Sequence, residues 1–349
     1  MKWNCLVAAL VGAMLASCAA LQKPSNSPVV SEKCSRIRAA FDVGSGSTKM
    51  KVAQIDICSQ RIVKVLEDRS VPIAFEESRR ASKNNEIAAD TKTEAIEKLR
   101  VLKGRAEELG ARAFIGVATS AFRKARNGSK VLTEISTQTK ITLKAVSEEE
   151  EGRLGFWGAV AHETGNSEQV VVWDVGGGSQ QWATLERTKR IKIHSSDFAS
   201  IGFKEAVIRK IQRADPKKKL TPNPLEANQV TAALEIAKEE AKKLPNRIHL
   251  KAMHPDARVL GIGGVHYYSV KGRLGVRDSG SYTANDIREL LPSVVGKTDE
   301  ELKSDYAATE VTNLLLILGM MEGLDIGQVF PLKANLADGV LVQNSYWPR

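Results

Sequence analysis

The sequence predicts an α/β protein made of two similar domains, each built on a mixed sheet. Three observations predict this fold class. The length of 349 residues suits two domains. An apolar run, an aspartate and a glycine-rich turn occur twice, at residues 39–47 and 170–179. Between and after the two copies, stretches with strand-like and helix-like spacing of apolar residues alternate.

The repeated hairpin is the most informative element. Its first copy reads AAFDVGSGS and its second reads VVVWDVGGGS, and a strand-like run follows each. One such turn says little, because glycine-rich hairpins are common and the aspartate can simply accept N–H groups of the turn. Two copies favour two domains of one plan whose turns face a shared inter-domain cleft.

The remaining elements follow from their periodicity. The run at 309–323 is strongly apolar but only fifteen residues long, so we expect a buried helix there rather than a membrane span. Ser147, with Glu150 three residues later, is expected to cap the helix that follows it. Helices are expected at 93–109, 120–139, 147–162, 200–212, 225–243, 283–291, 309–323 and 336–342, and strands at 113–118, 141–146 and 259–262.

These elements predict four segments of the chain. A signal peptide covers residues 1–17, and a lipidated tether covers residues 18–35. The first domain takes residues 36–149 and is completed by residues 330–347, and the second takes residues 150–329.

The N-terminus predicts export. Lys2 precedes a short apolar run that ends in Leu-Ala-Ser-Cys at Cys18, which resembles a bacterial lipobox. We expect cleavage before Cys18 and lipidation of its thiol; an ordinary signal peptide cut nearby is the alternative. Position 19 is alanine, whereas an aspartate directly after the lipidated cysteine retains many lipoproteins at the inner membrane. The expected location is therefore the periplasmic side of the envelope, at the outer membrane.

Two cysteines remain for the folded part. Cys5 would leave with the signal peptide and Cys18 would carry lipid, which leaves Cys34 and Cys58 in an oxidising compartment. Their midpoint is Gly46, in the predicted hairpin turn, so the two should face each other across the strands. We expect a Cys34–Cys58 disulfide; two free thiols are the alternative.

The composition limits the classes of binding partner that this protein is expected to have. A net charge of +10 favours anionic partners, whereas an aromatic content of 5% argues against a surface that stacks nucleic-acid bases. We expect no nucleic acid and contact with the membrane only through the lipid. The assembly state is left open, a homodimer included.

The glycine turns suit phosphate binding. Glycines let backbone N–H groups approach a phosphate, and an aspartate at a strand end can hold Mg²⁺ or its water. The acidic run at 148–151 begins a helix. A solvated acidic first turn is its simplest interpretation. The functional interpretation needs one of these glutamates to point into the cleft and deprotonate a water there.

Four strings occur in order: AFDVGSGS at 40–47, ATSAFRKARNG at 118–128, SEEEEGRL at 147–154 and DVGGGS at 174–179. Together they resemble the exopolyphosphatase and guanosine pentaphosphate phosphohydrolase family of the actin-like ATPase superfamily. The resemblance spans residues 38–345 and suits a short two-domain form. It implies two actin-like (ribonuclease H-like) domains around an inter-domain cleft.

The resemblance also implies roles. Glu151 matches the catalytic base, with Glu150 as second choice. Asp42 and Asp174 match the acids around Mg²⁺. The phosphate-binding positions implied are Gly44, Ser45, Gly46, Ser47, Thr48, Arg123, Gly176, Gly177, Gly178 and Ser179.

This sequence departs from the family pattern in four places. Gly46 stands where the family has asparagine, and Gln181 stands where a glutamate helps to hold metal. The third Gly-Gly turn, at 263–267, lacks its threonines, and the closing motif at 337–341 lacks its arginine.

The resulting expectation is an Mg²⁺-dependent hydrolase that removes a terminal phosphate from polyphosphate or a guanosine polyphosphate. Export favours polyphosphate. A catalytically impaired envelope sensor of polyphosphate or nucleotide is one alternative, and an ATPase or kinase of the same fold is another.

Overall fold

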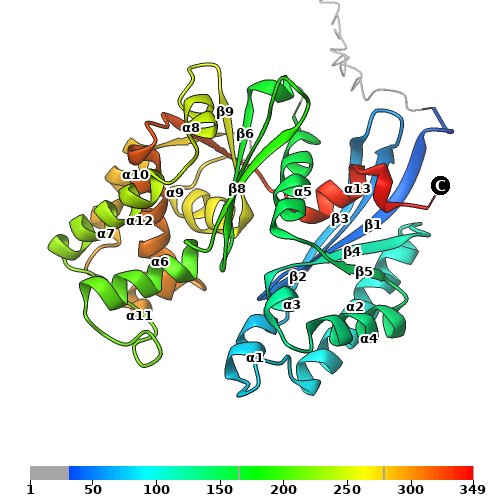
Figure 1. The fold of residues 1–349 in the computed structure, drawn as a ribbon, viewed down its shortest axis with the longest axis horizontal. Helices are drawn as coiled ribbons and strands as arrows, with labels where there is room; N and C mark the ends of the chain where they lie inside the picture. Colours follow the sequence, from blue (N-terminus) through cyan, green and yellow to red (C-terminus); the bar gives the residue numbers. More distant parts are fainter. Residues whose placement is uncertain (1–30, 164–165, 278–279, 349) are drawn as a thin grey trace, which may run out of the picture.

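The computed structural model describes residues 31–163, 166–277 and 280–348. The predicted signal peptide, the lipidation at Cys18 and most of the tether lie outside the described residues. Figure 1 shows two lobes. Helices α5 (Glu148–Val160) and α13 (Leu336–Val342) lie side by side where the two lobes meet. Each lobe contains one mixed sheet, ordered β3-β2-β1-β4-β5 in the first and β10-β11-β9-β6-β7-β8 in the second.

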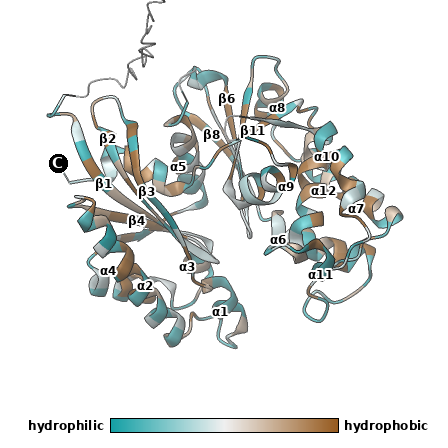
Figure 2. Cartoon of the chain, turned by 180° about the vertical axis from the view of Figure 1, so that it is seen from behind, coloured by the Kyte–Doolittle hydropathy of each residue, from teal (hydrophilic) through white to brown (hydrophobic). Residues whose placement is uncertain are grey.

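The first lobe is a three-stranded antiparallel unit extended by two parallel strands. Helices α2 and α4 pack on it through apolar residues such as Leu99 and Ile135, and both carry brown beside teal in Figure 2. The elements are β1 (Ser35–Val43), β2 (Ser47–Asp56), β3 (Arg61–Pro72), α1 (Phe75–Ala81), α2 (Ala89–Glu108), β4 (Phe114–Ala118), α3 (Ser120–Lys124), α4 (Gly128–Thr139) and β5 (Thr142–Ala145).

The second lobe repeats this plan, with β6, β7 and β8 antiparallel and β9 and β11 parallel to β6. Its strands are β6 (Val170–Val175), β7 (Gln180–Leu185), β8 (Ile191–Ser196), β9 (Arg258–Ile262), β10 (Tyr282–Thr283) and β11 (Gln328–Pro331). Its helices are α6 (Ser200–Ala206), α7 (Ala227–Ala241), α8 (Asn246–Ala252), α9 (Gly272–Leu274), α10 (Ala284–Leu290), α11 (Asp299–Leu302) and α12 (Ala307–Gly323), with π-helical stretches at Val207–Ile211 and Val265–Lys271. Short 3₁₀ turns lie at Ser167–Gln169, Leu291–Ser293 and Asn344–Tyr346.

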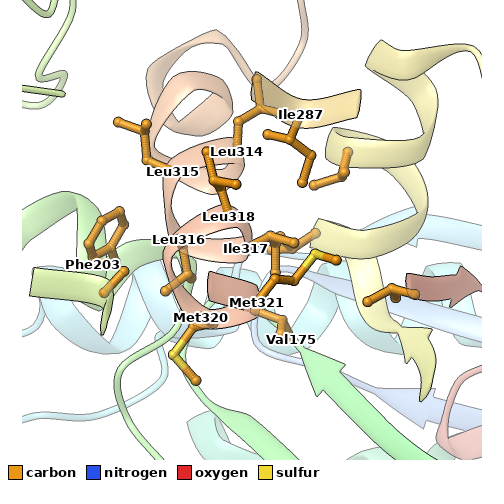
Figure 3. Close-up of a cluster of buried hydrophobic side chains, with 14 of the residues drawn as sticks. Val175, Phe203, Ile287, Leu314, Leu315, Leu316, Ile317, Leu318, Met320 and Met321 are labelled. Atoms are coloured by element: carbon orange, nitrogen blue, oxygen red, sulfur yellow. The ribbon is translucent and has the colours of Figure 1, made fainter. Parts of the chain in front are cut away.

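The apolar run at 309–323 forms most of α12, and it is buried as predicted. Figure 3 shows its side chains, among them Leu314 and Ile317, within a cluster that includes Phe203 of α6 and Ile287 of α10. In the described part of the chain, no helix combines the length and apolarity that crossing a bilayer requires.

The sequence did not predict the third strand of either hairpin unit. Every residue of β3 and β8 is at least partly exposed. An edge strand of this kind gives no clear alternation of apolar and polar residues. The repeated unit is therefore three strands long, not two.

Helix α5 (Glu148–Val160) and the closing helix α13 (Leu336–Val342) cross at close range. A Cβ added at Gly158 would lie 2.9 Å from the carbonyl oxygen of Asn335, and one at Gly339 would meet the backbone of Leu154. Glycine is needed at both positions because a larger residue would separate the helices.

The aspartate of the closing motif supports this junction. Asp338 is fully buried and accepts hydrogen bonds of 2.7 Å from Lys51 Nζ on β2. His162, just beyond α5, places Nε2 2.8 Å from the same carboxylate. Burial acts to raise the pKa of Asp338, but Lys51 and His162 outweigh it and lower that pKa.

Two elements cross the predicted domain boundaries. Helix α5 begins at Glu148, so it continues across the division expected between 149 and 150. Strand β11 (Gln328–Pro331) belongs to the second sheet, so the chain returns to the first lobe only after Pro331. Strand β11 stays with the second lobe because the second sheet satisfies its backbone hydrogen bonds.

Cys34 and Cys58 form a disulfide that closes the open end of the β1–β2 hairpin, with Cα atoms 5.4 Å apart. The register pairs Ser35 with Asp56. Cys34 therefore stands opposite Ile57, whose N–H donates to its carbonyl at 2.8 Å, and the disulfide reaches the next residue along the strand.

Candidate active site

The two glycine turns have the same backbone geometry. Gly44 N–H donates to Ser47 O at 3.0 Å, and Gly176 N–H donates to Ser179 O at 3.0 Å. Both turns join the first and second strands of their units. The duplicated strings thus form duplicated structures.

The carbonyl groups of the turns are used by neighbouring elements. Ser45 O accepts from Glu76 N–H, and Gly46 O accepts from Ile73 N–H. In the second turn, Gly176 O and Gly177 O accept from the N–H groups at the start of α6.

The amide groups of the turns point elsewhere. Among the described residues, no acceptor is found for the N–H groups of Ser45, Gly46, Gly177, Gly178 or Ser179. Gly46, Gly177 and Gly178 are exposed. The turns therefore have unpaired N–H donors, while the carbonyl acceptors named above are already paired. This arrangement suits the binding of an anion.

An aspartate precedes each turn, and its cross-strand partner differs between the lobes. Asp42 pairs with Lys49 in the β1–β2 register, and Asp174 pairs with Gln181 in the β6–β7 register. Each partner stands seven positions after its aspartate in the sequence. Lys49 Nζ lies 3.0 Å from Asp42 Oδ2. Gln181 instead donates from Nε2 to Ser179 Oγ at 3.1 Å.

Glu151 is the glutamate of the acidic run that faces these aspartates. It lies in the first turn of α5 and is only 8% exposed. Its Oε2 accepts a 2.6 Å hydrogen bond from Arg123 Nη1 of α3. Burial is the main cause that raises the pKa of Glu151 to about 7. Arg123 opposes that rise, and the charges of Asp174 and Asp42 add to it.

The second choice of base, Glu150, is directed away. Its Oε1 accepts a 2.6 Å hydrogen bond from Tyr346 Oη, and its Oε2 pairs with Arg153 at 3.3 Å. Glu150 and Glu151 are successive helix positions, about 100° apart, so their side chains point in different directions. The Glu150 carboxylate is thus engaged by Tyr346 and Arg153 in this structure, and Glu150 completes only half of the predicted capping box. Its N–H donates to Ser147 Oγ at 3.2 Å, while its carboxylate is engaged elsewhere.

Arg123 has a different first partner from the one expected. It was predicted to contact substrate phosphate, but its Nη1 donates to Val146 O at 2.8 Å and to Glu151. Its Nη2 is buried without a hydrogen-bond partner among the described residues, 3.6 Å from a Glu148 oxygen. Arg123 thus holds the glutamate in place, and its contact with substrate phosphate stays a prediction.

The third Gly-Gly turn closes on Asp174. Gly263 has φ of +85°, and a Cβ there would lie 2.6 Å from Val175 O and would also meet Asp174 Oδ1. Only glycine fits this backbone conformation and this contact. The turn follows β9, so the ends of β1, β6 and β9 and the tip of α5 meet near the carboxylates.

Comparison with known proteins agrees with this geometry. The model of the Ppx/GppA phosphatase family matches residues 51–344, more than half of the chain. The chain belongs to the Ppx/GppA phosphatase family. The prediction of a phosphoanhydride hydrolase is thereby confirmed at the level of this family.

Solved structures of the family share the fold. A Ppx/GppA family member from Aquifex aeolicus superposes with a TM-score of 0.70 at 18% identity, over 89% of this chain and 98% of that one. An exopolyphosphatase from Cytophaga hutchinsonii gives a TM-score of 0.66 at 16% identity, over 88% and 96%. The predicted fold class, two actin-like domains of α/β type, is confirmed.

The donor set of this family member suits a hard cation. Asp42 and Asp174 offer carboxylate oxygens, which Mg²⁺ prefers. No described residue donates a hydrogen bond to the Asp174 carboxylate, and burial is the main cause that raises its pKa to about 6. Gln181 uses its Nε2 for Ser179, so its Oε1 remains as an uncharged oxygen ligand. Thr48 Oγ1 is buried without a partner among the described residues.

Lys49 is the residue that the sequence analysis missed. Burial acts to lower the pKa of its ammonium, but Asp42 and Asp174 outweigh it and raise that pKa. The signal was present: Gln181 was singled out at its position after Asp174, and the same count from Asp42 leads to Lys49.

A separate cavity lies away from this site. A cavity of about 550 Å³ lies at the other end of β6, where Gln169 precedes the strand and Lys251 of α8 lines the wall. Its lining mixes acidic and basic side chains.

Proposed function

We propose that this protein hydrolyses the terminal phosphoanhydride of inorganic polyphosphate or a guanosine polyphosphate, with Glu151 as the base that activates water. The observation that supports it most is the position of Glu151, buried beside Asp42 and Asp174 and held by Arg123. A pKa of about 7 suits a general base at neutral pH, because such a base must be deprotonated and still basic.

The residues divide the chemistry among them. The unpaired N–H groups of the two turns bind phosphate oxygens, and Arg123 keeps Glu151 in place. Glu151 accepts the proton of water as the water attacks in line with the leaving oxygen. Preorganised donors of this kind stabilise the charge that develops in the transition state.

Asp42, Asp174 and Gln181 are the residues that would hold Mg²⁺. When bound there, Mg²⁺ neutralises phosphate charge and orients the phosphate chain. Gln181 contributes no charge, so the affinity for Mg²⁺ should be lower than with a glutamate at that position.

A glutamine substitution separates turnover from binding. Glu151→Gln keeps the shape and should lower kcat for phosphate release from polyphosphate by about 10² to 10⁴-fold, with little change in substrate affinity. Glu149→Gln, at an exposed position in the same run, is the matched control. Full activity of Glu151→Gln would remove the basis for this proposal. Tight binding by the wild-type protein without release would favour the sensor.

We also propose that the protein is exported and anchored to the bacterial envelope by a lipid on Cys18. The Cys34–Cys58 disulfide supports an oxidising compartment. Replacement of Cys18 by alanine should move the protein from the membrane fraction to the soluble fraction. A protein that stays in the membrane fraction after that change contradicts the anchor.

A further inference from the structure

Lys49 occupies an unusual place for a lysine. It lies on β2 directly across from Asp42, and its Nζ is 3.0 Å from Asp42 Oδ2. Its side chain is 32% exposed, so it is neither a solvated surface lysine nor fully enclosed.

The charge of the Lys49 ammonium interacts with both aspartates. Its charge acts on Asp174 as well as on Asp42, across the boundary between the two lobes. Asp174 has no hydrogen-bond donor among the described residues, and the Lys49 charge acts to lower the pKa of Asp174 against the effect of burial. The other cation of the site, Arg123, is bound to Glu151. Lys49 is therefore the counter-ion of the aspartate pair.

A counter-ion at this point conflicts with a metal ion. Mg²⁺ binds carboxylate oxygens at about 2.0–2.1 Å, and an ammonium 3.0 Å from one of those oxygens repels it. The equivalent position in the second lobe carries the neutral Gln181. Neither cross-strand position thus supplies the negative charge that would favour a divalent ion.

We propose that Lys49 is a resident cation that competes with Mg²⁺ for Asp42 and Asp174, so that the metal binds only after the ammonium is displaced. The inference rests on the proposed function in one respect, the assignment of the metal to these aspartates. Lysine suits the role because its charge sits on a flexible stem and can rotate toward solvent.

The test measures metal binding without substrate. Mn²⁺, which also prefers oxygen ligands, is titrated into the full-length protein, and free Mn²⁺ is measured by electron paramagnetic resonance. Lys49→Met should bind Mn²⁺ at least about tenfold more tightly, because a positive charge beside the site is removed. Lys49→Arg keeps the charge and should bind like the wild type.

Two further variants make the result specific. Lys189→Met removes a lysine that is paired with Glu168 at 2.6 Å in the turn between β7 and β8, at the opposite end of β7 from Asp174, and should leave Mn²⁺ affinity unchanged. Adding Asp42→Asn to Lys49→Met should abolish the gain. If Lys49→Met fails to fold by circular dichroism, Lys49→Gln takes its place.

The outcomes separate this inference from the function itself. Equal Mn²⁺ affinity in the wild type and Lys49→Met overturns the role of Lys49 and leaves the hydrolase proposal intact. No Mn²⁺ binding by any variant overturns the metal assignment as well. Tighter binding by Lys49→Met alone supports the resident cation.

Discussion

Arg123 donates from Nη1 to Glu151 Oε2 at 2.6 Å, and this contact joins the short helix α3 to the tip of α5. The arginine lowers the pKa of a glutamate that burial and two aspartates raise. The pKa of Glu151 is therefore set by a balance between burial and the two aspartates on one side and Arg123 on the other.

The first prediction follows from that balance. Only the deprotonated form of Glu151 can accept a proton, so kcat/KM should rise with pH through about 7 at fixed free Mg²⁺. Arg123→Gln removes the opposing charge, so the midpoint should move to higher pH. Arg153→Gln, on the same helix but paired with Glu149 and Glu150, should leave the midpoint in place. A pH profile that is unchanged in Arg123→Gln contradicts the assignment.

The second prediction concerns Asp338. Asp338→Asn removes the closer of the two carboxylates beside the buried Lys51 ammonium and leaves only Asp68, at 3.7 Å, so the free energy of unfolding in urea should fall by about 3 kcal/mol. Because its pKa is lowered in the folded state, this contribution is present at neutral pH and is lost only as pH falls below the ordinary value of 3.8. Asp256→Asn, at an exposed site, is the control. Equal stability of the two variants is the outcome that counts against this role.

Part of this arrangement could be predicted from the sequence and part could not. Asp42, Asp174 and Glu151 lie in strings whose spacing indicates turns and a helix start, and the structure brings them together. Asp338 and Lys51 are 287 residues apart, and no local pattern links them. Their contact depends on where α13 packs, which only the tertiary structure determines.

The choice between Glu150 and Glu151 shows the same limit. Neighbouring positions in one helix share a local sequence, and the partner that distinguishes them, Tyr346, comes from the C-terminal end of the chain. The edge strands β3 and β8 were missed for another reason, since partly exposed strands lack a buried face. Local pattern predicts elements well where one face is buried.

The third prediction concerns the disulfide. Cys34 and Cys58 are 24 residues apart, and closing a loop of this length should stabilise the protein by about 3 kcal/mol in the chain-entropy account. Cys34→Ser should lower the urea midpoint of the oxidised protein accordingly. Wild-type protein treated with reductant should show the same loss. A midpoint that neither change affects would show that the bond contributes nothing to stability.

The fourth prediction uses two glycines of one turn. A Cβ at Gly46 meets no atom within 4 Å, whereas a Cβ at Gly44 would lie 2.9 Å from Ser47 O. Gly46→Asn should therefore fold normally and add a side-chain donor beside the turn's amide groups. One hydrogen bond of about 1 kcal/mol corresponds to a KM for polyphosphate lowered about fivefold. Gly44→Asn must shift the backbone of the turn and should cost about 1–3 kcal/mol of stability. Urea unfolding and phosphate-release kinetics on both variants check this pair, and a Gly46→Asn protein with unchanged KM would show that the first turn does not contact the substrate.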